Sequence, residues 1–92
     1  MLLNFEWDED KAELNFIKHG ITFDEAISVF DDELSLTIND TEHSIIEDRF
    51  IDIGLSNKNR YIVVVYTERQ EKIRIISSRL ATKMEIRNYE KK

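Results

Sequence analysis

The sequence contains no cysteine and no proline, and only two of its 92 residues are glycine. Without cysteine the chain can form neither a disulfide bond nor a thiolate metal site, which fits a reducing cytosol. The longest apolar run, Tyr61–Tyr66, is far shorter than the ~18 residues that a transmembrane helix needs. The N-terminus lacks the basic start and the long apolar stretch of a signal peptide. These absences predict a cytoplasmic protein that does not associate with a membrane.

Positive charge is scarce in the first half of the chain. Residues 1–46 contain two cations, Lys11 and Lys18, against twelve Asp and Glu, a net charge of −10. Residues 47–92 contain eleven Lys and Arg against seven Asp and Glu, a net charge of +4. The arginine-rich half is therefore a candidate for an anionic partner such as phosphate. The acidic half predicts either a contact with a basic protein or a solvated surface.

The length of the chain predicts a single domain spanning residues 1–92. A domain of this size buries only about 60–65% of the surface of its unfolded chain, so its core is small. It has room for a shallow site on one side of a sheet but not for a deep cofactor crevice. The apolar content of 41% indicates a folded chain rather than a disordered one.

Local capping signals predict three helices. Asp8 is a suitable N-cap for the first helix, and Gly20 is placed to end it. Thr22 and Thr82 each begin a capping box, with Glu three residues later. The predicted helices are residues 9–19, 23–30 and 83–89.

Alternation of apolar and polar residues predicts five strands. They are residues 3–7, 34–38, 50–55, 62–66 and 73–78. The fourth is apolar on both faces and is therefore expected at the centre of the sheet. Because the later strands follow one another closely, the order of elements predicts an α+β fold. This fold is a small antiparallel β-sheet meander packed by two N-terminal helices and one C-terminal helix.

The sequence contains no recognisable metal or phosphate-loop motif. His19 and His43 are far apart and have no second His or Cys at ligand spacing, and no glycine-rich loop is present. Scattered residues do not support a Ser-His-Asp triad. The remaining candidates are basic residues of the later strands and the last helix: Arg49, Arg60, Arg69, Lys72, Arg74, Arg79, Lys83 and Arg87.

Arg74 is an unusual residue in an apolar strand. Its neighbours Ile73 and Ile75 are expected on the opposite face, so that Arg74 shares its own face with Ile76. A guanidinium in this position either pairs with a carboxylate or is exposed to a ligand. Its planar fork matches a phosphate, and it stays charged at any working pH. A phosphate contact and a structural ion pair both remain open.

Arg79 lies just past this strand, at the junction with the last helix. Lys83, Arg87 and Lys91 follow at intervals of four and form one stripe of that helix. A solvated helix whose cations complement its dipole is the alternative explanation, and it is preferred for Lys91. Arg79 and Lys83 remain candidates because junctions between strands and helices often line sites.

Two further candidates are an acid–cation pair and a histidine. Glu47 and Arg49 are two residues apart on a strand, so a possible general base and a phosphate-binding cation share one face. Such pairs are also common salt bridges. His19 ends the first helix near Ala12 and Phe16, and its alternative role is a partly buried histidine that donates to a carbonyl.

Ordered motifs cover nearly the whole chain. They are Phe5-Glu6-Trp7-Asp8, Asn15-x-x-Lys18-His19-Gly20, Val29-Phe30-Asp31-Asp32, Glu47-x-Arg49-Phe50, Tyr66-Thr67-Glu68-Arg69 and Arg74-Ile75-Ile76-Ser77-Ser78-Arg79-x-Ala81-Thr82-Lys83. In this order they resemble the BrnT family of toxins. The resemblance implies a RelE-like fold and a bacterial type II toxin that cleaves RNA without a metal or cofactor and thereby blocks translation. It also implies a BrnA-like antitoxin partner with a ribbon-helix-helix DNA-binding region, through which DNA is contacted only indirectly.

Metal-independent RNA cleavage needs a base, an acid and a cation that stabilises the charged phosphorane. We assign phosphate stabilisation to Arg74 and Arg79. His19 is the candidate acid or base, and Glu47 is the alternative base. A separate set, Arg49 and Lys83, is expected to bind the flanking RNA backbone.

Two other classes of function remain. One is a non-catalytic module that binds a ribbon-helix-helix repressor and modulates its DNA binding. The other is a regulator that binds nucleic acid directly. The acidic net charge of the chain weighs against the regulator, because phosphate binding is mostly electrostatic.

Overall fold

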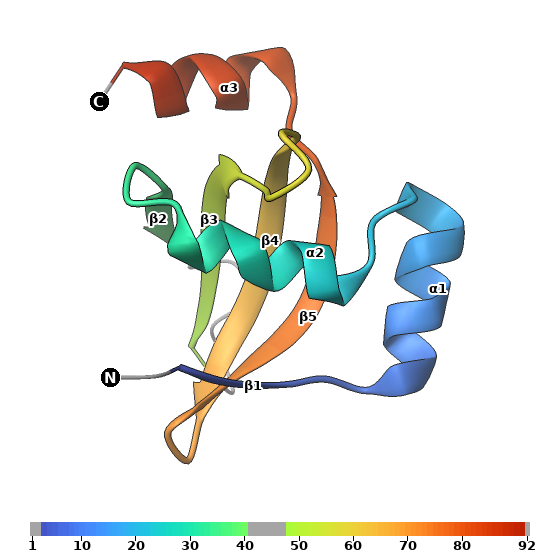
Figure 1. Ribbon diagram of the computed structural model, residues 1–92. Helices are drawn as coiled ribbons and strands as arrows, with labels where there is room; N and C mark the ends of the chain where they lie inside the picture. The colour runs from blue at the N-terminus through green and yellow to red at the C-terminus, as the bar shows by residue number, and fades with distance from the viewer. Residues whose placement is uncertain (1–2, 41–47, 92) are drawn as a thin grey trace.

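A five-stranded sheet forms the centre of the structure, a computed structural model that describes residues 3–40 and 48–91 (Figure 1). The strands are β1 (Asn4–Glu6), β2 (Leu36–Asn39), β3 (Arg49–Leu55), β4 (Tyr61–Arg69) and β5 (Lys72–Leu80), in the order β1-β5-β4-β3-β2. β2 to β5 form the predicted antiparallel meander. β1 adds a parallel edge to β5, so the sheet is mixed. The predicted α+β class is confirmed.

All three helices begin where the capping signals predict, but the second, predicted as residues 23–30, is α-helical only to Ile27. They are α1 (Glu9–His19), α2 (Phe23–Ile27), which continues as the 3₁₀ helix η1 (Ser28–Asp31), and α3 (Lys83–Glu90). The Asp8 carboxylate accepts from the backbone N–H groups of Asp10 and Lys11, and Gly20 ends this helix with φ of 71°. Thr82 and Glu85 form a complete capping box at the start of α3. None of the helices in the described ranges is long and apolar enough to cross a membrane.

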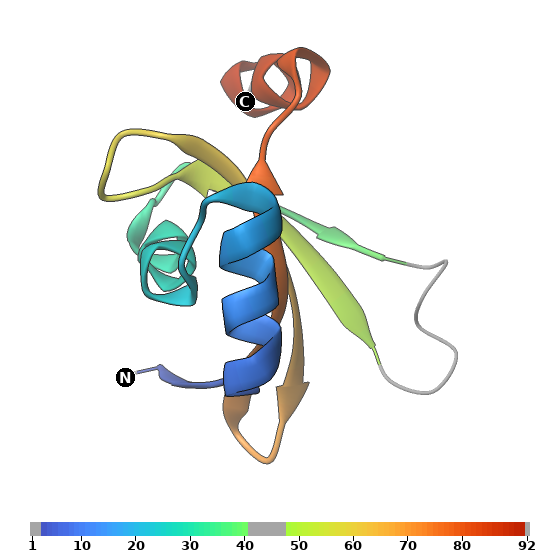
Figure 2. The ribbon, with the colours of Figure 1, turned by 90° about the vertical axis from the view of Figure 1, so that its right-hand side faces the viewer.

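The helices occupy three different positions around the sheet. α2 and η1 cross one face of the sheet (Figure 1). On this face their apolar side chains pack with those of β4 and β5. α1 stands alongside β5, and α3 lies beyond the end of the sheet at which β5 ends (Figures 1 and 2). The buried core residues are Ile21, Phe23, Ala26, Val29, Ile62, Val64, Tyr66 and Ile75. Only one face of the sheet is therefore covered by the α2–η1 layer.

Gly54 allows η1 to approach the sheet closely. A Cβ atom at this position would lie 2.8 Å from Cγ1 of Val29 and 3.1 Å from Oδ2 of Asp32. The same Asp32 carboxylate accepts hydrogen bonds from the Leu55 backbone N–H and from the Tyr89 hydroxyl, at 2.9 and 2.8 Å. Burial and this hydrogen bond raise the pKa of Tyr89 to about 12. The glycine thus brings η1 within reach of the end of α3.

Asn15 fastens α1 to the edge of β5. Its side-chain oxygen accepts from the Ser78 backbone N–H at 3.0 Å, and its side-chain nitrogen donates to the Ser78 hydroxyl at 2.9 Å. The same nitrogen also donates to the Ile21 carbonyl at 3.1 Å. Asn15 is only 8% exposed, and these bonds satisfy its buried amide. The position of α1 beside β5 is therefore specified by polar contacts as well as by apolar packing.

The turn between β4 and β5 is shorter than the sequence predicts. The polar residues Thr67–Glu71 suggest a turn of five residues, but β4 continues to Arg69 and β5 begins at Lys72. The two remaining residues, Gln70 and Glu71, have φ of 48° and 68°. Two positive φ values in a two-residue hairpin match the right-handed twist of the flanking strands. Here the geometry of the sheet overrides the weak preference of Gln and Glu for this conformation.

Candidate functional site

A β-bulge in β5 decides which side chains share a face. Val65 of β4 pairs with Ser77, whereas the next residue, Tyr66, pairs with Ile75. Ile76 is therefore an extra residue, and the alternation of side chains shifts at this point. Regular alternation predicts Ser77 on the face of Ile75. The bulge instead places Ser77 on the opposite face, because a shift of one residue reverses every later side chain.

The same bulge brings Arg74 and Arg79 to one face of the sheet. Arg74 lies opposite Thr67 and Arg79 opposite Val63, and these partners are four residues apart on β4. Both arginines therefore project from the face that α2 does not cover, which we call the outer face. Four residues of strand span roughly 13 Å, so the two guanidinium groups start from well-separated positions. The assignment of both arginines to phosphate stabilisation stays a prediction.

Arg79 makes a two-pronged ion pair with Glu85 of α3. Its Nη1 and Nη2 atoms donate to Oε1 and Oε2 of Glu85 at 2.8 and 2.9 Å. The Arg79 hydrogen bonds, with help from the Thr82 backbone N–H, lower the pKa of Glu85 to about 2. The same pairing raises the pKa of Arg79. The guanidinium is thus held at the junction of β5 and α3 with its fork on two oxygen atoms, the geometry that suits a phosphate.

Arg74 and Arg49 lie in a second row of the outer face. Arg74 is opposite Thr67, and Thr67 is opposite Arg49 on β3. The Nη1 atom of Arg74 lies 3.3 Å from a carboxylate oxygen of Glu6, its register partner on β1. Both side chains of this pair are about one third exposed. The ion pair that the sequence left open for Arg74 is therefore present, although the residue remains accessible.

A groove of about 220 Å³ lies where α1 meets β5. It is lined by His19 with the two cations of the acidic half, Lys11 and Lys18, and by Ser77 of the outer face. Arg79 lies two residues beyond Ser77 on the same face. The groove therefore brings a titratable imidazole and two ammonium groups to the segment of strand that carries Arg79.

Lys11 and Lys18 were missed as candidates, although the sequence holds a signal for them. They are the only cations of residues 1–46, and a spacing of seven places them on one side of a helix, two turns apart. The charge count identified both residues. Their position beside β5 depends on how α1 packs against the sheet, which the sequence does not show.

The remaining predicted residues are less closely grouped. Lys83 is exposed at the first position of α3. Glu47 lies outside the described residues, so its assignment stays a prediction. Among residues 3–40 and 48–91 no group of His, Asp and Glu is arranged to hold a metal ion.

Comparison with known proteins places the chain in a family. A family model described as the ribonuclease toxin BrnT of a type II toxin–antitoxin system matches residues 7–85. No curated relative matches the sequence. The crystal structure of the Brucella abortus ribonuclease toxin BrnT has the same fold, with a TM-score of 0.68 at 22% sequence identity, covering 89% of this chain and 100% of that one. Since the family model covers most of the sequence, the chain belongs to the BrnT family of type II toxin–antitoxin ribonuclease toxins.

Proposed function

We propose that this chain is a toxin that cleaves RNA without a metal ion and thereby blocks translation, as one domain acting in the cytoplasm. Membership of the BrnT family supports the activity. The observation that carries the proposal for the site is the groove between α1 and β5, which gathers Lys11, Lys18 and His19 beside Ser77. Such a groove brings an imidazole for proton transfer and two ammonium groups of α1 beside the strand that carries Arg79.

The chemistry requires a proton acceptor, a proton donor and stabilisation of negative charge. A base removes the proton of the RNA 2′-hydroxyl, whose oxygen attacks the adjacent phosphorus, and an acid protonates the leaving 5′ oxygen. The O2′–P bond forms and the P–O5′ bond breaks, which leaves a cyclic phosphate and a 5′-hydroxyl. His19 serves as acid or base, with Glu47 as the alternative base. DNA lacks the nucleophile and should resist cleavage.

The cations divide into two groups along the outer face. Arg79, together with Lys11 and Lys18, stabilises the phosphorane, because charge-assisted bonds in a partly buried site are strongest where negative charge develops. Arg79 must then exchange at least one carboxylate oxygen of Glu85 for a phosphate oxygen. The second row of the outer face, Arg49 and Arg74, contacts a neighbouring phosphate of the same RNA strand. Lys83, exposed at the start of α3, extends the RNA-binding surface.

The test is to incubate the purified protein with total RNA and with DNA of matched sequence, in the presence of EDTA. RNA should be degraded and DNA should stay intact, and His19→Ala should cleave more slowly than the parent. Cleavage that disappears with EDTA and returns with magnesium would exclude the metal-independent mechanism. Absence of cleavage under both conditions, together with tight antitoxin binding, would support the non-catalytic module instead.

The expected partner is a BrnA-like antitoxin with a ribbon-helix-helix region that represses the shared operon. An acidic segment of this partner could cover the outer face as a phosphate mimic and so block the site directly. Replacing Arg74 and Arg79 with Glu should then weaken antitoxin binding far more than reversing Glu9, Asp10 and Glu13 on α1. The opposite ranking would show that inhibition comes from the acidic side.

A further inference from the structure

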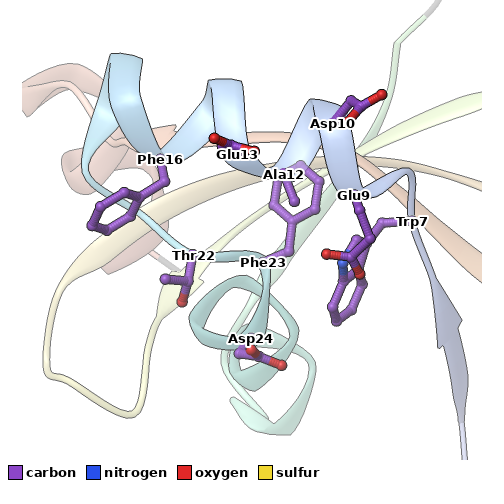
Figure 3. A pocket seen from close by; sticks show the side chains of 9 residues that line it. All are labelled: Trp7, Glu9, Asp10, Ala12, Glu13, Phe16, Thr22, Phe23 and Asp24. Atoms are coloured by element: carbon purple, nitrogen blue, oxygen red, sulfur yellow. The ribbon is translucent and has the colours of Figure 1, made fainter.

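A second hollow, of about 350 Å³, lies between α1 and α2 (Figure 3). Its floor is aromatic: Trp7 and Phe23 meet edge to face with ring centroids 5.9 Å apart, and Ala12 fills the space beside them. Phe16 forms one end of the hollow and is 52% exposed. The hollow shares no lining residue with the groove that holds His19.

The rim of this hollow carries negative charge only. Glu9, Asp10 and Glu13 of α1 and Asp24 of α2 surround it, and all four are exposed. None of them belongs to an ion pair within the described ranges, and Lys11 lines the other groove rather than this one. Phe23 is only 2% exposed, so the aromatic surface that a partner could reach is that of Phe16 and of the partly buried Trp7. This apolar surface and the unpaired acidic rim together favour a covering partner that is both apolar and cationic.

The acidic surface continues past α2. A neighbouring hollow of about 550 Å³ shares Asp24 with the first, includes Asp31, and has an apolar floor of Phe5, Ile27 and Phe30. The two hollows meet at the Asp24 carboxylate, so each can accept one apolar side chain of the same docking segment. An amphipathic helix presents such side chains three or four residues apart, with its flanks free to carry Lys and Arg.

We propose that the hollow between α1 and α2, called the acidic groove, docks a cationic amphipathic segment of a protein partner. Apolar side chains of that segment cover Trp7 and Phe16, and its Lys and Arg residues pair with the rim carboxylates. Because the acidic groove and the His19 groove have separate linings, both can be occupied at once. The proposal does not depend on nuclease activity.

Trp7 is the only tryptophan of the chain and lies in the acidic groove, so it reports occupancy directly. The probe is a synthetic amphipathic helical peptide of Leu and Lys, titrated into the full-length protein and followed by Trp7 fluorescence and by calorimetry. We expect saturable one-to-one binding with a blue shift of the emission. A peptide with Ser in place of Leu should bind at least about tenfold more weakly, a difference of about 1.4 kcal/mol.

Matched variants locate the binding. Glu13→Lys combined with Asp24→Lys should weaken the Leu/Lys peptide at least about tenfold. Glu33→Lys combined with Glu90→Lys changes the net charge equally, at exposed positions outside the acidic groove, and should have little effect. Equal weakening by both pairs would overturn the proposal, because it would reveal only non-specific attraction to an acidic protein.

A second pair of variants tests the aromatic side chains of the acidic groove. Phe16→Ala should weaken binding, whereas Ile17→Ala, at a neighbouring side chain that is 73% exposed and outside the lining, should not. Equal effects of the two would also overturn the proposal. So would concentration-dependent self-association of the free protein that Glu13→Lys abolishes, since the occupant would then be a second copy of this chain.

Discussion

The ion pair between Arg79 and Glu85 can be removed from either end, which separates a structural role of Arg79 from a catalytic one. Arg79→Ala deletes the guanidinium. Glu85→Gln deletes the same ion pair but keeps a side-chain oxygen that can accept from the Thr82 backbone N–H, so the capping box of α3 is retained. If Arg79 only fastens α3 to β5, the two variants should behave alike. If Arg79 stabilises phosphate, only Arg79→Ala should lose activity.

The stability cost is expected to be small and similar for both variants. The fall in the pKa of Glu85 from its ordinary value of 4.5 to about 2 corresponds to at most roughly 3.4 kcal/mol. The Arg79 side chain is 43% exposed, however, so that water screens the pair, and part of the fall comes from the Thr82 N–H, which both variants keep. We therefore expect about 1 kcal/mol, a minor part of the roughly 5–14 kcal/mol available to a domain of this size.

Urea unfolding measures this loss of unfolding free energy, and the direction in which the loss changes with pH follows from the pKa of Glu85. Because the folded-state pKa of Glu85 is lowered, the stabilisation by the pair is complete above about pH 4.5 and is lost as the pH falls toward 2. The difference in unfolding free energy between the parent and Glu85→Gln should shrink over that interval. A constant difference would show that the ion pair is not its cause.

RNA cleavage in EDTA and growth arrest on expression report the activity. Arg79→Ala should lose about 100-fold or more in cleavage rate, the usual cost of removing one donor to a developing oxyanion, and should no longer be toxic. Glu85→Gln should stay within a few-fold of the parent or exceed it, because the guanidinium no longer has to leave a carboxylate. A folded Arg79→Ala protein that still cleaves RNA, or equal losses in both variants, would refute the assignment.

Three further changes test the scaffold. Arg60→Ala should lower the urea midpoint more than Glu25→Ala, because it strands the buried Glu25 carboxylate, whose pKa the Arg60 hydrogen bonds lower in the parent. Without Arg60, burial raises the pKa of Glu25, so the gap between the two variants should close as the pH falls toward 4.5. Gln70→Asn combined with Glu71→Gly should raise the thermal midpoint by about 4–8 °C, since these residues suit two positive φ values and about 1 kcal/mol is gained. Gly54→Ala should cost about 1–3 kcal/mol in urea unfolding, because its Cβ would meet Val29.

Features that depend on a few neighbouring residues were predictable from the sequence. The caps at Asp8, Gly20 and Thr82 act within one helical turn, and the structure confirms all three. Alternation, which is equally local, located all five strands but not their ends: β2 begins at Leu36 rather than at Leu34, and β4 continues to Arg69 rather than ending at Tyr66. The predicted five-residue turn at Thr67–Glu71 was wrong, because there the twist of the paired strands outweighs the preferences of single residues.

The candidate site could be predicted as a set of residue types but not as an arrangement. The sequence identified Arg74, Arg79 and His19 individually. It did not reveal the extra residue Ile76, which reverses the face of everything after it, because nothing in the local pattern marks a bulge. Partners that are far apart in the sequence could not be predicted either. An example is Glu6, which pairs with Arg74 although 68 positions separate them. The docking of α1, which brings Lys11 and Lys18 to β5, could not be predicted for the same reason.

Asn15 has a consequence for the solubility of the toxin. β1 pairs with β5 at Lys72–Arg74, and farther along the strand the Asn15 amide oxygen accepts from the backbone N–H of Ser78. A side chain thus takes the place that another strand would fill. Any ligand or mutation that pulls α1 away uncovers a strand edge, and uncovered edges recruit other chains into aggregates. We therefore expect the docking of α1 to protect this edge of β5 from pairing with another chain.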